Sequence, residues 1–182
     1  MDMLDFEEGD LYFDEPLQAE AKRCLDSAAE QYGKGSAEQL LMRAYFLEPE
    51  HPIVLVALYR YFYYQHRLEE ALIVADRVLK VFASRLEISE DWNQLNEMEI
   101  GGGVLISMTM TRFYMLVLKG AGFLELRLGL YESALARLKK VVELDSKDRL
   151  GARALIDVAQ DALRNGAGPE TAMHSQTTGE MR

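Results

Sequence analysis

The feature that most restricts what this chain can fold into is a helix-turn-helix pattern that recurs along it. Residues 52–79 show apolar side chains at helical spacing on both sides of a short polar turn, His66-Arg67. The pattern also occurs in residues 17–47 and in residues 118–142, which have glycine-containing breaks at residues 33–35 and 129–131. A last amphipathic segment spans residues 149–163. The sequence therefore predicts an all-α fold of three helical hairpins and a C-terminal capping helix.

The spacing of the hairpins points to a known repeat. Ala37 and Ala71 hold equivalent positions in the second helices of the first two hairpins and lie 34 residues apart, whereas Ala71 and Ala134 lie 63 apart. A hairpin that recurs at 34 residues is the signature of the tetratricopeptide repeat. The chain resembles that family over residues 17–163, and the resemblance rests on Ala37, Leu41, Ala44, Pro49, Ala71, Ala75, Val78, Gly122, Ala134 and Val141.

The chain also departs from the tetratricopeptide pattern. Leu25 and Tyr59 stand where the first helix of a repeat often has a small residue, and Ala83 and Ser146 replace the closing proline. We expect these departures to alter the packing angles and ends of the hairpins, and not the fold class.

The resemblance implies a solenoid whose first helices line a concave groove, where a peptide or helix of another protein binds. In that geometry, the residues expected to face the groove are Lys22, Asp26, Val56, Arg60, Tyr63, Tyr64, Lys119, Phe123, Arg127 and Arg153. Arginine and tyrosine dominate the energetic hot spots of protein interfaces. Tyr63 fits equally well in the core of its hairpin, beside Tyr59 and Phe62.

Residues 84–114 form an insertion between the second and third hairpins. We expect the preceding helix to continue to about Glu87, a short helix from Ser89 to about Met98, a break at Gly101, Gly102 and Gly103, and a long helix over residues 104–128. Glycines before a helix can bind a phosphate or cofactor, so a cofactor-binding protein is an alternative. The insertion lacks the Lys-Ser/Thr pair of phosphate loops, and no cofactor is expected.

Charge and composition restrict the partners. The net charge is −10, and residues 1–15 hold seven acids and no base. An acidic chain without a basic stripe repels nucleic acid and anionic membranes, so we expect neither as a partner.

We expect residues 1–16 to be a flexible acidic arm, residues 17–163 the helical domain, and residues 164–182 a disordered tail. The aromatic residues of the arm could dock in the groove of their own chain or of a second copy.

The sequence shows no catalytic or metal-binding constellation. Cys24 is the only cysteine, and His51, His66 and His174 are too widely spaced to share a helical face. The absence of a signal peptide and of a long apolar run leads us to expect a cytoplasmic protein that is not an enzyme. The expected role is that of an adaptor, chaperone or assembly factor.

Two stretches carry a second resemblance. Residues 59–72, YRYFYYQHRLEEAL, and residues 118–129, LKGAGFLELRLG, look like small repeat proteins that accompany bacterial nitrogen-fixation genes. This resemblance implies an accessory factor for maturation or protection of a multisubunit metalloenzyme such as nitrogenase.

Overall fold

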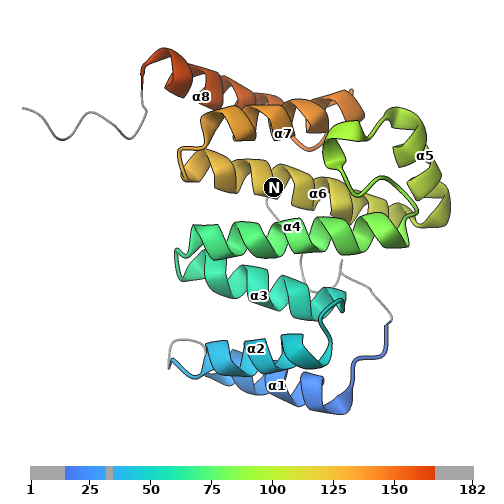
Figure 1. Cartoon of the computed structure of the whole chain (residues 1–182), viewed down its shortest axis with the longest axis vertical. Helices are drawn as coiled ribbons and strands as arrows, with labels where there is room; N and C mark the ends of the chain where they lie inside the picture. Colours follow the sequence, from blue (N-terminus) through green and yellow to red (C-terminus); the bar gives the residue numbers. More distant parts are fainter. Residues whose placement is uncertain (1–14, 32–34, 167–182) are drawn as a thin grey trace, which may run out of the picture.

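A computed structural model describes residues 15–31 and 35–166, and every regular element within them is helical (Figure 1). The all-α class is thus confirmed. The expected arm, apart from residues 15 and 16, and the expected tail from residue 167 onward lie outside the described residues. The elements are α1 Ala19–Glu30, α2 Ala37–Leu47, α3 Pro52–Tyr64, α4 Leu68–Arg85, a 3₁₀ turn η2 Trp92–Gln94, α5 Glu97–Ile106, α6 Met108–Arg127, α7 Tyr131–Leu144 and α8 Ala152–Arg164.

The helices stack along the long axis of the molecule, each antiparallel to its neighbour in the stack (Figure 1). From α1 to α4, each helix packs against the next in the chain, and the same holds from α6 to α8. α4 packs directly on α6, so the stack continues across the insertion and α5 lies at its side. The α3–α4 and α6–α7 hairpins are therefore spatial neighbours despite their separation in sequence.

The turns of these two hairpins have the same geometry. His66 and Gly129 both adopt left-handed backbone conformations, with φ of 58° and 76°. In each turn, the next residue donates its N–H to a carbonyl five residues earlier: Arg67 to Phe62 and Leu130 to Glu125, both at 2.9 Å. These bonds satisfy carbonyls that a helix end would otherwise leave unpaired. His66 and Gly129 are therefore 63 residues apart, as are Ala71 and Ala134.

The core extends along the stack, and α4 lies at its centre between α3 and α6. Its largest fully buried side chains include Tyr59 on α3, Phe82 on α4, and Phe113 and Tyr114 on α6. The Phe82 and Phe113 rings lie 4.8 Å apart, which joins α4 to α6. Small residues let other helices approach closely: a Cβ on Gly122 of α6 would lie 2.9 Å from Cγ of Leu138 on α7.

The insertion differs from its predicted structure in three ways. The glycines at 101–103 lie inside α5, and the predicted long helix is interrupted at Ser107. The break was wrongly predicted because a capping box formed by Asn96 and Glu99 starts a helix ahead of the glycines. Ser107 is extended, and its hydroxyl accepts from Met110 N–H at 3.2 Å, which starts α6. The helix predicted from Ser89 to Met98 is only the turn η2.

Candidate functional site

The structure distributes the ten predicted groove residues over four helices. Lys22 and Asp26 on α1, Tyr64 on α3, Arg127 on α6 and Arg153 on α8 are exposed, and Arg60, Tyr63 and Phe123 are half-buried. Val56 and Lys119 are buried, so they offer little accessible surface to a partner. The exposed residues of the predicted groove are therefore spread over four helices, and those on α3 and α6 lie in the C-terminal halves of these helices.

On α3, aromatic rings form a continuous series from the core to the surface. The ring centroids of Tyr59 and Tyr63 lie 6.0 Å apart, and those of Tyr63 and Tyr64 lie 5.8 Å apart. Tyr59 is fully buried, whereas Tyr64 is 52% exposed. Tyr63 packs against the core and also against Tyr64. It therefore contacts both the hairpin core and an exposed side chain that was predicted to face the groove.

On α6, the Arg127 guanidinium lies 5.9 Å from the Phe123 ring. α3 and α6 flank α4 and run in the same direction, which places their C-terminal halves on the same side of the stack, at the left in Figure 1. We call Arg60, Tyr63, Tyr64, Phe123 and Arg127 the α3–α6 surface.

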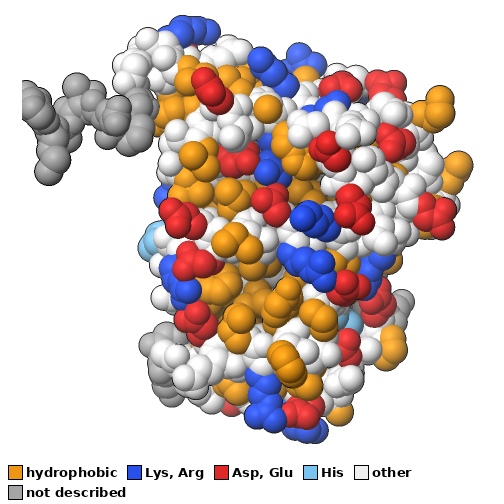
Figure 2. Space-filling model, in the orientation of Figure 1, with side chains coloured by type: hydrophobic (Ala, Val, Ile, Leu, Met, Phe, Trp, Pro, Cys, Tyr) orange, Lys and Arg blue, Asp and Glu red, His pale blue; other side chains and the backbone are white. Residues whose placement is uncertain are grey.

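A second candidate site, an apolar cleft between α2 and α4, was missed by the sequence analysis. α3 forms its floor, and its volume is about 220 Å³. Figure 2 shows hydrophobic side chains gathered in this lower half of the molecule. The residues that line the cleft are Met42, Tyr45, Leu55, Leu58, Phe62, Glu70, Ile73, Val74 and Arg77. The sequence does contain a signal for this cleft. Large apolar residues occur outside the Ala and Leu positions that pack inside the hairpins, namely Met42, Phe46 and Ile73.

Ion pairs close both ends of this cleft. Arg67 contacts Glu38 of α2 at 2.7 Å and Glu70 of α4 at 2.8 Å, and its guanidinium lies 4.7 Å from the Phe62 ring. At the other end, Arg77 contacts Glu50 at 2.8 Å. The hydrogen bond between Arg67 and Glu70 lowers the pKa of that carboxyl, which keeps the pair ionised. Each charge at the ends of the cleft is thus paired, although the buried Nε of Arg77 has no hydrogen-bond partner among the described residues. The lining between these pairs is mostly apolar, so the space suits apolar side chains.

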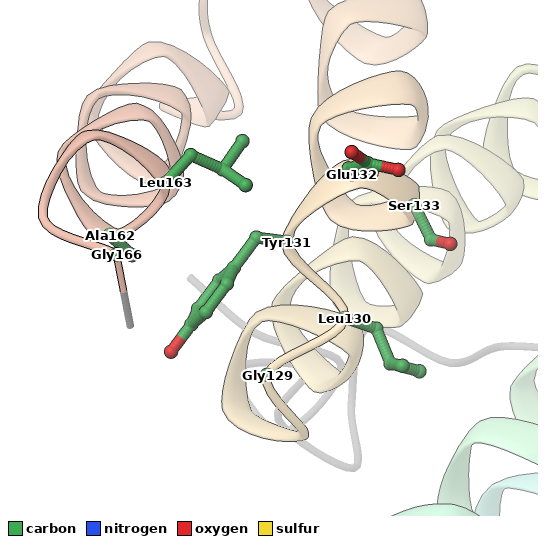
Figure 3. A pocket seen from close by; sticks show the side chains of 8 residues that line it. All are labelled: Gly129, Leu130, Tyr131, Glu132, Ser133, Ala162, Leu163 and Gly166. Carbon is green, nitrogen blue, oxygen red and sulfur yellow. The ribbon is translucent and has the colours of Figure 1, made fainter. Parts of the chain in front are cut away.

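A third hollow, of about 370 Å³, lies between the α6–α7 turn and the end of α8. Tyr131 and Leu163 point toward the space between α7 and α8 (Figure 3). Glu132 and Ser133 also border it, and it opens widely to solvent. A single carboxylate and a hydroxyl on an open surface form no recognisable catalytic arrangement.

A further group of charges lies in a cluster that is mostly buried. Arg137 of α7 donates to both carboxylate oxygens of Glu125 on α6, at 2.8 and 3.1 Å, and to Asp76 of α4 at 2.8 Å. Its guanidinium also lies 4.8 Å from the Trp92 ring. Burial raises the pKa of Glu125, and the hydrogen bond from Arg137 opposes that shift. Arg137 and Glu125 are both about 5% exposed, which leaves no room for a substrate, so the cluster joins helices.

The described residues give no support to a metal site or a membrane anchor. They contain no group of three His, Cys, Asp or Glu side chains that could hold a metal ion. Within the same ranges, none of the helices combines the length and the apolarity needed to cross a bilayer. Cys24 is a buried free thiol.

Comparison with known proteins gives one informative match. No protein-family model and no solved structure matches the chain, so the tetratricopeptide resemblance rests on the residues and spacing given above. The chain is 48% identical over 158 residues to a protein of Azotobacter chroococcum mcd 1 named "Uncharacterized 19.8 kDa protein in nifW 5'region". The match covers 87% of this chain and 88% of the relative, and it fits the resemblance to proteins that accompany nitrogen-fixation genes. This chain therefore belongs to the same family as that Azotobacter protein.

Proposed function

We propose that this chain is a non-enzymatic, tetratricopeptide-like interaction protein that serves nitrogen fixation as an adaptor, chaperone or assembly factor, and that it binds an amphipathic helix of a partner protein. The observation that carries the proposal is the apolar cleft between α2 and α4, with its charged ends already paired. Support for the process comes from the relative, whose name places it in the nifW 5' region. An intracellular protein that matures or protects a metalloenzyme fits both observations.

The shape of the cleft favours a helix as its occupant. α2 and α4 run in the same direction on either side of α3 (Figure 1). The cleft that they line therefore has two parallel walls. Met42 on α2 is 46% exposed and Ile73 on α4 is 68% exposed, so each wall offers a large apolar side chain. Phe46, one turn beyond Met42, extends the first wall. A helix binds such a cleft through apolar residues at i, i+3 or i+4, and i+7.

The magnitudes are adequate for a specific complex. Each Leu or Phe anchor that becomes buried contributes about 1.5–3 kcal/mol before association costs. Three or four such anchors contribute about 4.5–12 kcal/mol, and association costs of at least about 4 kcal/mol leave a dissociation constant that is micromolar at the tightest. This affinity suits an accessory factor that must release its client.

The α3–α6 surface is the competing site within the same proposal. Arg60 and Tyr64 were predicted to face a partner, and the aromatic series on α3 supports that role. The cofactor-binding alternative loses its main support, because Gly101, Gly102 and Gly103 lie within α5 and not before a helix.

The test compares two double variants with the unmodified chain in affinity capture from extracts of nitrogen-fixing Azotobacter cells, read by quantitative mass spectrometry. Met42→Glu/Ile73→Glu places charges on both walls of the cleft, and we expect it to lose the captured partner. Arg60→Ala/Tyr64→Ala is the control, and we expect it to retain that partner. The opposite result would move the site to the α3–α6 surface. Undiminished capture by both folded variants would overturn the proposal.

Catalysis and cofactors need a separate check. We expect no change in melting temperature with ATP, GTP or NADH, and no stoichiometric metal in the purified protein. A saturable thermal shift with one nucleotide would instead favour the cofactor-binding alternative.

A further inference from the structure

We propose that two copies of this chain form a symmetric dimer in which their α5 helices pack antiparallel. The proposal does not depend on the partner-binding role, because α5 lies at the side of the stack and does not line the cleft between α2 and α4 (Figure 1). It rests on the exposure of α5, on the chemistry of its outer face, and on the charges at the two ends of that face.

The outer face of α5 is apolar and exposed to solvent. Met98 is 86% exposed and Leu105 is 89% exposed, and Ile106 and Met108 beside them are also exposed. Gly103 is the only buried residue of this helix. Figure 2 shows hydrophobic side chains projecting from the right-hand edge of the molecule, over α5. Large apolar side chains that gather in this way at a protein surface mark an interaction site.

The centre of this face allows close approach. Met98, Gly101, Gly102 and Leu105 follow the i, i+3, i+4, i+7 spacing, so they lie on one side of the helix. A Cβ at Gly101 or at Gly102 would meet no atom within 4 Å. Packing within the described chain therefore does not require glycine at these two positions, although glycine disfavours a helix. A second helix could contact the backbone there, with the apolar side chains at each end fitting around it.

The charges at the ends of the face identify a second copy as the occupant. Glu97 is exposed at the start of α5, and Arg112 is exposed in the second turn of α6, which follows α5 directly. Neither side chain makes an ion pair among the described residues. A two-fold interface must be complementary to itself, because the same patch is used by both copies. With antiparallel α5 helices, Glu97 of each copy faces Arg112 of the other, and the apolar residues meet between them.

The test measures the mass of the full-length chain in solution by sedimentation equilibrium, from about 1 to 200 μM, a range centred on the micromolar affinities of small interfaces. We expect the mass to rise from 20.7 kDa toward twice that value as concentration increases. Leu105→Glu should weaken association by about 30-fold or more, because it buries a charge within the apolar contact. Ile73→Glu is the matched control on the cleft, and it should dimerise as the unmodified chain does.

Charge exchange tests the orientation. Glu97→Arg and Arg112→Glu should each weaken association, because each places like charges opposite one another, and the double variant should restore it.

A chain that stays monomeric across the whole range overturns the dimer. Equal loss in the Leu105→Glu and Ile73→Glu variants overturns the assignment to α5. A double variant that is no better than either single variant overturns the antiparallel arrangement. Circular dichroism confirms that each variant is folded before its mass is interpreted.

Discussion

Replacing Arg137 by methionine is the sharpest test of the buried cluster that joins α4, α6 and α7. Methionine keeps an unbranched apolar side chain in place of the arginine stem, so the change removes charge and hydrogen bonds with little loss of packing. Glu125 then loses both of its bonds to Arg137 while it stays buried. Asp76 also loses its bond, at little cost, because its side chain is 45% exposed and solvent replaces the partner.

The expected loss of unfolding free energy is about 3–5 kcal/mol at neutral pH, the usual result of leaving one member of a buried ion pair without its partner. The loss depends on pH. Burial already raises the pKa of Glu125, and the variant lacks the hydrogen bond that opposed this shift, so its pKa rises further. A carboxyl with a raised pKa in the folded state favours the protonated form. Its contribution to stability is therefore present below the unfolded-state pKa and is lost as pH rises through the folded-state pKa. The deficit should be larger at pH 8 than at pH 5.

Urea denaturation at these two pH values measures the difference, with circular dichroism for the helices and fluorescence of Trp92, the only tryptophan, for the cluster itself. The double variant Arg137→Met/Glu125→Leu leaves no buried charge in the pair, so it should recover most of the lost stability. The reasoning fails if the single variant costs less than about 1 kcal/mol at pH 8, or if the double variant is no more stable than the single one.

Two further substitutions test the packing of α6. Gly122→Ala should cost about 1–3 kcal/mol, because the new Cβ would lie 2.9 Å from Leu138, and combining it with Leu138→Val should cost less than the sum of the two single changes in thermal or urea unfolding. Strict additivity would show that this contact is not tight. Tyr114→Phe removes a buried hydroxyl that has no hydrogen-bond partner among the described residues, so stability should stay the same or rise by about 1 kcal/mol, and a clear loss would contradict this.

Strong local signals made much of the fold predictable from sequence. Pro52 is the first residue of α3, and His66 and Gly129 lie in the turns that end α3 and α6, so each marks a helix boundary through backbone geometry alone. The glycines at 101–103 were misleading because glycine lowers helix stability without forbidding a helix. The last helix begins at Ala152, later than predicted, because the Asp148 side chain accepts from the Ala152 N–H at 2.8 Å and caps it.

The candidate sites were less predictable because they depend on how helices meet. Periodicity put Val56 and Lys119 on an outward face, but it does not measure how much of each side chain the folded chain covers. The cleft requires α2 and α4 to flank α3, and the pairing of Arg137 with Glu125 requires α6 to pack on α7. No spacing within a single helix contains this information.

The direct contact between α4 and α6 has a consequence for the order of folding. Residues 86–107 must close into a loop before these helices can meet, whereas the other neighbours in the stack are joined by short turns. The segments α1–α4 and α6–α8 can each form from local contacts, which are fast, and their docking has to wait for that closure. Since doubling the length of a loop costs only about 0.6 kcal/mol, relatives could lengthen or shorten this segment with little change in equilibrium stability. Such changes would mainly alter the rate at which the segments α1–α4 and α6–α8 dock.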